Sequence, residues 1–153
     1  PKNLYCATFK EYEGTFLAGA EAAFLSKKAS VGTVGGLDIP FLHRYSDGFA
    51  EGAKHVNPSI KTKTLWVGGQ SPFNDPATGK EQTLSLAAGG ADTVLAAAGA
   101  TNSGIFQGAT QAKINAFGVD VNQCGQAPGI VLDNVTKVVD TAVVKVVDGV
   151  LSG

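Results

Sequence analysis

The sequence predicts an α/β protein with a parallel, doubly wound sheet that helices cover on both faces. Short apolar segments alternate along the chain with longer segments of helical periodicity, as in repeated strand and helix units. The apolar run over residues 93–98 indicates the sheet type. It is evenly apolar and too short to cross a bilayer, which is typical of a central parallel strand. Glycine pairs at 35–36 and 89–90 end two of the segments.

The expected elements follow one another along nearly the whole chain. The expected strands are 4–10, 31–36, 61–67, 93–98, 116–119 and 130–135. The expected helices are 13–26, 40–56, 76–88, a stretch of about ten residues after 99–104, and 138–151. Asp75 and Pro76 form a helix start, because the acid can cap the helix and proline suits its first position. The many valines of 138–151 also suit a strand, so that alternative stays open.

Composition predicts one compact domain with attached pieces. Of the 153 residues, 44% are hydrophobic and only 16% are charged, which is enough apolar material for one substantial core. The formal net charge of −1 argues against nucleic-acid binding. The chain contains no Met, so Pro1 is not an initiator and we interpret the chain as a processed product or a fragment. Cys6 and Cys124 are expected to be unpaired thiols rather than a disulfide.

The familiar catalytic and cofactor motifs are missing. Residues 99–104, GATNSG, offer an anion site at a helix N-terminus, but Ile105 stands where a nucleotide-triphosphate loop has its lysine. Thr101 breaks the GxGxxG pattern, and GxSxG does not occur. His43 and His55 lie in one expected helix without metal-ligand spacing. We therefore expect no enzyme, no metal and no cofactor.

A carboxylate at a strand end is the strongest candidate for binding. Asp120 follows the expected strand 116–119, and in parallel sheets ligands bind at the carboxyl ends of the strands. There it can accept hydrogen bonds from the hydroxyls of a ribose, although capping a turn is an equally good interpretation. Gly99 ends the neighbouring strand and leaves room for a ligand beside the backbone.

Aromatic and basic side chains near the other strand ends add further candidates. Phe73 and Trp66 follow one strand, where an aromatic face can stack on a planar base or pack in the core. Phe106 is a second stacking candidate. Lys137 follows the last strand and is a candidate partner for Asp120 or for Asp38, or else a solvated side chain.

Several stretches carry a resemblance to a known family. They are EGTFLAGAEAAFLSK, VGTVGGLDIPFLHRYSDGFAEGAKHVNP, VGGQSPFNDPATGKEQTLSLAAGGADTVLAAAGATNSGIF and AFGVDVNQ, followed by Lys137 and Asp140 in TKVVD. Together they resemble the basic membrane lipoproteins, which are solute-binding proteins of ABC importers. Several members of that family take purine nucleosides. The resemblance runs through nearly the whole chain.

The resemblance implies a periplasmic-binding-protein type I fold. Such proteins have two similar α/β domains joined by crossing strands, with the ligand in the cleft between them. Residues 1–9 would then be the last strand of a largely missing first domain, and 10–135 the second domain. Residues 136–153 would form the crossover and a helix that returns to the first domain. A missing segment or a complementary chain would supply the rest of that first domain.

The resemblance also implies a function without chemistry. The protein would capture a nucleoside and deliver it to an ABC transporter permease, as a periplasmic or cell-surface lipoprotein. The main alternative is the ligand-sensing domain of a transcriptional or signalling regulator, because this fold also serves there. A nucleoside hydrolase is a third candidate, but the acid cluster DxDxxxDD that it would need is absent.

Roles for single residues follow from the same resemblance. Asp120 would hold the ribose hydroxyls, Phe73 would stack on the base, and Gly99 and Thr101 would line the pocket. Asp38 and Lys137 would lie beside the hinge. The family usually has a second acid two residues after the ribose acid. Here that residue is Asn122, which leaves the exact ligand open.

Overall fold

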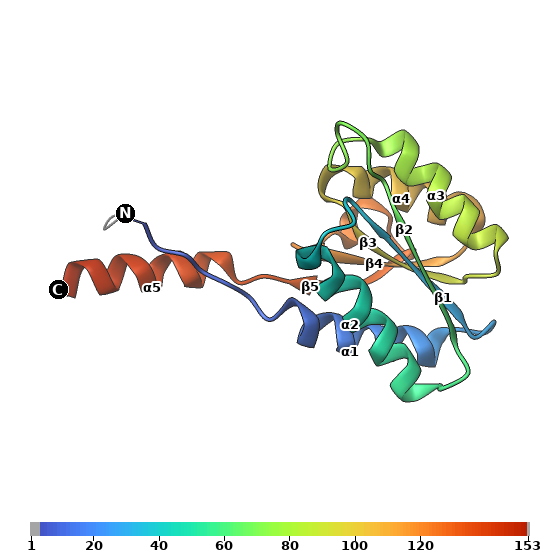
Figure 1. The fold of residues 1–153 in the computed structure, drawn as a ribbon, viewed down its shortest axis with the longest axis horizontal. Coiled ribbons are helices and arrows are strands. Elements are labelled where there is room, and N and C mark those ends of the chain that lie inside the picture. The colour runs from blue at the N-terminus through green and yellow to red at the C-terminus, as the bar shows by residue number, and fades with distance from the viewer. Residues whose placement is uncertain (1–3, 153) are drawn as a thin grey trace.

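A computed structural model describes residues 4–152 and contains one parallel sheet of five strands. The strand order is β2-β1-β3-β4-β5, and every neighbouring pair is parallel (Figure 1). The strands are β1 (Ser30–Gly35), β2 (Lys61–Trp66), β3 (Thr93–Ala97), β4 (Asn115–Asp120) and β5 (Val131–Thr136). The predicted parallel α/β sheet is confirmed.

Four helices cover the sheet, two on each face. Helices α1 (Glu11–Leu25) and α2 (Pro40–Val56) pack on one face, and α3 (Pro76–Ala88) and α4 (Asn102–Ala112) on the other (Figure 1). Each pair closes its own apolar core against the sheet. Phe49 and Phe117 belong to the first core, whereas Leu86 and Phe106 belong to the second.

The evenly apolar sequence of β3 follows from its position between these two cores. All of its residues are buried. Leu95 and Ala97 contribute to the core under α1 and α2, while Val94 and Ala96 contribute to the core under α3 and α4. Since successive side chains of a strand point to opposite faces, a strand covered on both sides favours apolar residues toward both faces, as in Val94 to Ala97.

The helix start predicted at Asp75 is confirmed. The Asp75 side chain accepts a hydrogen bond from the backbone N–H of Thr78 at 3.0 Å, and Pro76 is the first helical residue. This hydrogen bond and a second one from the Thr78 hydroxyl hold the pKa of Asp75 below its ordinary value. A carboxylate that accepts these bonds is stabilised in its charged form.

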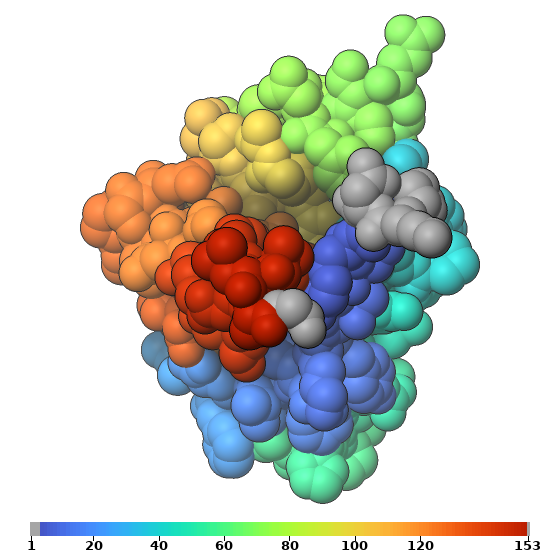
Figure 2. Space-filling model, turned by 90° about the vertical axis from the view of Figure 1, so that its left-hand side faces the viewer, coloured from blue at the N-terminus to red at the C-terminus, as the bar shows by residue number. Residues whose placement is uncertain are grey.

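The two ends of the described chain leave the domain on the same side. Residues 4–10 run beside α5 (Val139–Ser152), and both project away from the sheet (Figure 1). Figure 2, viewed from that side, shows α5 end-on with the N-terminal segment next to it. Tyr5 and Phe9 line a shallow cavity together with valines of α5. Many apolar side chains of α5 are exposed, among them Val143, Val147 and Val150.

The structure of these two segments tests the secondary structure predicted for residues 138–151 and 4–10. The helix predicted over 138–151 is confirmed, and its strand alternative is wrong. The strand predicted over 4–10 is also wrong for this chain, because these residues pair with none of the strands in the described part. An alternating sequence becomes a strand only beside a partner strand. The assignment of residues 1–9 and 136–153 to another domain stays a prediction. None of the helices in residues 4–152 is long and apolar enough to cross a membrane.

Candidate ligand-binding site

The carboxyl ends of the parallel strands bring most of the predicted residues to one edge of the sheet. Asp120 is the last residue of β4 and pairs in register with Thr136 of β5, so Lys137 follows directly beside it. Gly99 lies just beyond β3, the other neighbour of β4. Parallel strands end at a common edge, and this edge is where α/β proteins bind ligands.

Asp120 is held in a fixed orientation. Its backbone has a φ of 70°, in the left-handed region, and its carbonyl oxygen accepts a hydrogen bond from Lys137 N–H at 2.9 Å. Its side chain is 48% exposed. Oδ1 accepts a hydrogen bond from the Tyr45 hydroxyl at 3.1 Å and lies 3.0 Å from Lys137 Nζ. The carboxylate is thus anchored through one oxygen while half of the group faces solvent.

Lys137 is a largely buried cation between two carboxylates. Its Nζ lies 3.4 Å from Glu11 Oε1 as well as 3.0 Å from Asp120, and its side chain is 18% exposed. Burial alone would lower the pKa of Lys137. The neighbouring hydroxyl of Tyr45 and the charge of Asp120 outweigh burial, so the pKa is raised. The ammonium also lies over three aromatic rings, at 5.3 to 5.7 Å from their centroids: Phe9, Phe41 and Tyr45.

Tyr45, in helix α2, contributes a hydrogen-bond donor to this cluster. Burial raises the pKa of Tyr45 to about 12, and the charge of Asp120 acts in the same direction against the opposing effect of Lys137. The phenol therefore stays protonated at neutral pH. A protonated phenol is the hydrogen-bond donor that the carboxylate needs.

Phe73 lies over two strand ends. A Cβ atom on Gly36, just after β1, would collide with the Phe73 ring, and one on Gly99 would lie 3.3 Å from Phe73 Cβ. Gly99 also has a φ of 58°, which favours glycine. Phe73 as a residue is 42% exposed. Phe73 thus covers the ends of β1 and β3 and keeps one part of its surface open.

Thr101 fastens the loop that carries Phe73. Its side chain is fully buried. Its hydroxyl donates to the carbonyl oxygen of Pro72 at 3.0 Å and accepts from the Asp75 N–H at 2.8 Å. Its own N–H donates to the carbonyl of Phe73 at 3.3 Å. The structure therefore places Thr101 beneath Phe73, and its predicted contact with a ligand stays a prediction.

Asp38 has a different partner from Asp120. Its Oδ1 lies 2.7 Å from His43 Nε2, and the other ring nitrogen of His43 lies 3.5 Å from Asp47. The hydrogen bond with Asp38 is the main reason that the pKa of His43 is raised. The imidazole also packs against Trp66, with ring centroids 5.1 Å apart. Of the two carboxylates considered as partners of Lys137, the structure selects Asp120.

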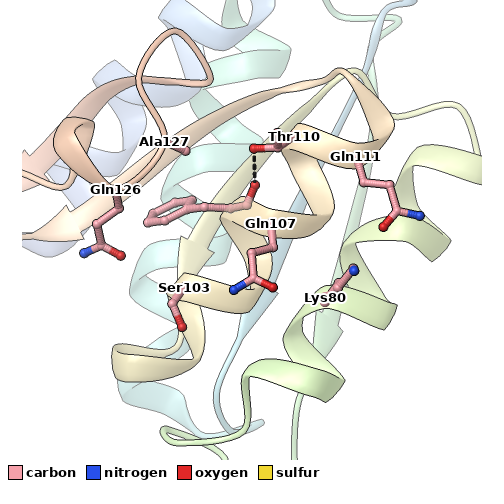
Figure 3. Close-up of a pocket in the computed structure, with 8 residues that line it drawn as sticks. Lys80, Ser103, Gln107, Thr110, Gln111, Gln126 and Ala127 are labelled. Atoms are coloured by element: carbon pink, nitrogen blue, oxygen red, sulfur yellow. Dashed lines mark hydrogen bonds between the residues drawn. The ribbon is translucent and has the colours of Figure 1, made fainter.

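Phe106 was the second stacking candidate, and that prediction is wrong. Only 1% of its surface is exposed, because α4 turns it into the core against the sheet. Phe106 also forms part of the lining of a cavity of about 410 Å³ between α3, α4 and the 124–127 turn (Figure 3). The polar groups around this cavity include Lys80, Gln107 and Gln111, and Asp120 does not line it.

A buried amide network supports the strand ends and could not be recognised from a motif. Asn102, at the start of α4, accepts from the Ala98 N–H at 2.9 Å and donates to Gln123 Oε1 at 3.2 Å. The same Gln123 oxygen accepts from the Val119 N–H at 3.1 Å. The Gln123 N–H donates to Asn134 Oδ1 at 3.0 Å. These bonds join β3, β4 and β5. Their only sequence signals are one amide at a helix start, one in the turn after β4 and one within β5.

Comparison with known proteins identifies the family. The family model described as "ABC transporter substrate-binding protein PnrA-like" matches residues 1–153. The chain belongs to this PnrA-like family. It is 34% identical to basic membrane protein D of Borreliella burgdorferi over 92% of this chain and 41% of that protein. It is 30% identical to the ABC transporter nucleoside-binding protein BmpA of Lactococcus lactis, over 99% of this chain and 47% of that protein.

A solved structure supports the same fold for this PnrA-like chain. An ABC transporter solute-binding protein from Aeropyrum pernix superposes with a TM-score of 0.82 at 26% identity, over 95% of this chain and 43% of that one. The chain thus spans less than half the length of the relatives it matches. The PnrA-like family consists of ABC transporter substrate-binding proteins, as the resemblance of the sequence implied. In residues 4–152, no three side chains of His, Cys, Asp or Glu gather as metal ligands.

Proposed function

We propose that this chain forms one wall of an interdomain cleft in which a solute-binding protein captures a nucleoside, specifically a purine nucleoside, for an ABC importer. The observation that carries the proposal is the arrangement around Asp120. A half-exposed carboxylate, oriented by Tyr45 and Lys137, lies at the same sheet edge as a half-exposed Phe73. One group suits a sugar and the other suits a planar base.

The carboxylate suits the ribose because of how it is anchored. Tyr45 and Lys137 both use Oδ1 of Asp120, so Oδ2 is the oxygen that a ligand hydroxyl can reach. Hydrogen bonds to an ionised group are shorter and stronger than neutral ones. Two adjacent hydroxyls, as in a ribose, are the natural partners of a carboxylate with spare acceptor sites.

The aromatic ring suits the base. Phe73 rests on glycines at the ends of β1 and β3, and Thr101 fixes the loop on either side of it. A ring held in this way presents its face without a large entropic cost on binding. Stacking of a base on an aromatic side chain stabilises binding by about 1–3 kcal/mol. The larger surface of a purine favours it over a pyrimidine on such a ring.

Asn122 limits how far the base can be specified. It stands two residues after Asp120, where the resemblance led us to expect an acid, and its Oδ1 accepts from the Cys124 N–H at 3.0 Å. In this position it shapes the turn after β4 and adds no charge. We therefore assign the ribose contact to Asp120 and leave the choice among purine nucleosides to the binding experiment.

The remaining partners follow from the family. We propose that the opposite wall of the cleft comes from a first-domain segment or a complementary chain, and that the loaded protein docks on an ABC transporter permease. We place it outside the cytoplasm, as a periplasmic or cell-surface lipoprotein. The substrate-binding family and its nucleoside-binding relative favour this function over a regulator's sensor domain.

Isothermal titration of the full-length gene product tests the proposal. Adenosine, guanosine and inosine are titrated beside free ribose, adenine and a set of amino acids. We expect saturable heat with at least one of the purine nucleosides and much weaker binding of ribose or adenine alone. Binding of sugars or amino acids with no heat from any nucleoside would reject the substrate class.

A further inference from the structure

We propose that Glu11 is a positioning residue for the ligand site: its buried carboxylate holds Lys137 beside Asp120 and so tunes the affinity of Asp120 for a ligand hydroxyl. The part that concerns affinity rests on the proposed function. The claim that Glu11 holds Lys137 is independent of the proposed function and can be tested without a ligand. No sequence motif pointed to Glu11.

The surroundings of Glu11 are unusual for an acid at a helix start. It is the first residue of α1, yet its side chain is only 3% exposed. Oε1 lies 3.4 Å from Lys137 Nζ, and Oε2 lies 3.6 Å from Arg44 Nη1. Within the described residues, Oε2 is buried without a hydrogen-bond partner. Burying a carboxylate with incomplete pairing costs free energy, so fold stability alone does not account for it.

The usual reason for an acid in the first turn of a helix, its interaction with the helix dipole, applies better to Glu13 than to Glu11. Acids in the first turn of a helix stabilise the positive end of the helix dipole. Glu13 is in the same turn, is exposed, and pairs with Lys10 at 2.8 Å. It can supply the dipole interaction at little desolvation cost. The burial of Glu11 therefore points to a partner, and the cation that it faces most closely is Lys137.

The geometry explains why Lys137 needs such a partner. Its backbone is fixed by the hydrogen bond to the Asp120 carbonyl, but a lysine side chain has a flexible four-carbon stem. With Glu11 on one side and Asp120 on the other, the ammonium is shared between two carboxylates. Without Glu11, the strongly hydrated ammonium would be free to leave the cluster for solvent. Asp120 would then lose one of the two contacts that orient it.

Glu11 also lies where the two projecting segments join the domain. Phe9, Glu11 and Lys137 line one small cavity of about 120 Å³ between the start of α1 and the end of β5. From this point residues 4–10 and α5 run outward together (Figure 1). The ion pair therefore ties the two segments to each other at the site of Asp120.

The ligand-free test measures the chemical reactivity of Lys137. The full-length protein is treated with acetic anhydride at pH 8, and acetylation of Lys137 is followed by mass spectrometry. Only an accessible, neutral amine reacts, so an ammonium that leaves the cluster for solvent is acetylated faster than one held between two carboxylates. We expect Glu11→Gln to raise the rate several-fold. The matched control is Glu13→Gln, which changes the same charge in the same helical turn and should leave the rate unchanged. Equal rates in the two variants would overturn the proposal.

The binding test measures affinity for adenosine and adenine. We expect Glu11→Gln to weaken the binding of adenosine about tenfold, as loss of one contact to a charged group would, and to leave the binding of adenine unchanged. In a Lys137→Met background the same substitution should have no further effect. An equal loss in that background, or a loss shared by adenine, would overturn the positioning role. Thermal unfolding checks each variant, and Glu11→Asp, which keeps the charge, should retain most of the Lys137 protection if Glu11→Gln unfolds.

The two tests separate the possible failures. If the wild-type protein binds no nucleoside, the proposed function fails while the acetylation rates still decide whether Glu11 holds Lys137. If acetylation changes but affinity for adenosine does not, the contact exists and the positioning role is overturned.

Discussion

The hydroxyl of Tyr45 lies 3.1 Å from Oδ1 of Asp120, although 75 positions separate the two residues in the sequence. Helix α2 packs across the sheet face, which places the Tyr45 phenol at the carboxyl end of β4. Lys137 approaches the same oxygen from the end of β5. Two elements, α2 and the end of β5, thus converge on the carboxylate at the end of β4.

Replacing Tyr45 with Phe should weaken nucleoside binding without unfolding the protein. The ring packing is kept, and only the hydrogen bond to Asp120 is lost. A hydrogen bond to a charged group contributes about 1.5–3 kcal/mol, and some of this is recovered here because Asp120 keeps Lys137. We expect a loss of affinity near the lower end of that range, measured by isothermal titration. Unchanged affinity would show that the phenol does not orient the carboxylate.

The stability of the protein should fall at alkaline pH partly because of this cluster. The pKa of Lys137 is raised above the ordinary 10.5, and that of Tyr45 is raised from 10.0 to about 12. Both groups hold their protons more tightly in the folded state. Their contribution is therefore complete below about pH 10 and is lost as the pH rises toward the folded-state values. Denaturant unfolding between pH 9 and pH 11 should show this loss.

The Lys137→Met variant provides the comparison for that experiment. It removes the group with the raised pKa and keeps a side chain of similar length. We expect its free energy of unfolding to decline less between pH 9 and pH 11 than that of the wild type. Parallel curves for the two proteins would mean that Lys137 titrates in the folded state as it does in the unfolded chain.

Thr101→Val should destabilise the protein and loosen Phe73. The substitution keeps the shape of the side chain but leaves the partly buried Asp75 N–H and Pro72 carbonyl without their partner. Leaving buried polar groups unpaired costs about 1–3 kcal/mol, which denaturant unfolding should detect. Thr110→Val is a suitable control, since its hydroxyl bonds only to the Phe106 carbonyl one turn earlier in α4. If the two variants are equally stable, Thr101 does not fasten the loop.

The regular parts of the fold could be predicted because their signals are local. The run over 94–98 is apolar at every position, and the structure places it between two cores. Asp75 and Pro76 are two adjacent residues that together predict a helix start, and the structure has the Asp75 cap at that place. The position of Asp120 at a strand end also follows from local pattern. Parallel sheet geometry then brings it beside Gly99 and Lys137.

The partners of Asp120 were less accessible to sequence reasoning. Tyr45 is an ordinary aromatic residue in an amphipathic helix, and Glu11 is an ordinary acid in a first turn. Their roles depend on how α1 and α2 pack, which no spacing rule states. Residues 4–10 show the converse case. Their alternation is typical of a strand, but a strand also requires a neighbour, and the described chain provides none for them.

The most direct test of the central claim is the affinity of an Asp120→Ala variant of the full-length protein for purine nucleosides. Calorimetric titration with the nucleoside that binds the wild type best should show a loss of about 1.5–3 kcal/mol, the contribution of a charged hydrogen-bonding partner. Binding of the free base should change little. An Asp120→Ala variant that binds the nucleoside as tightly as the wild type would contradict the account.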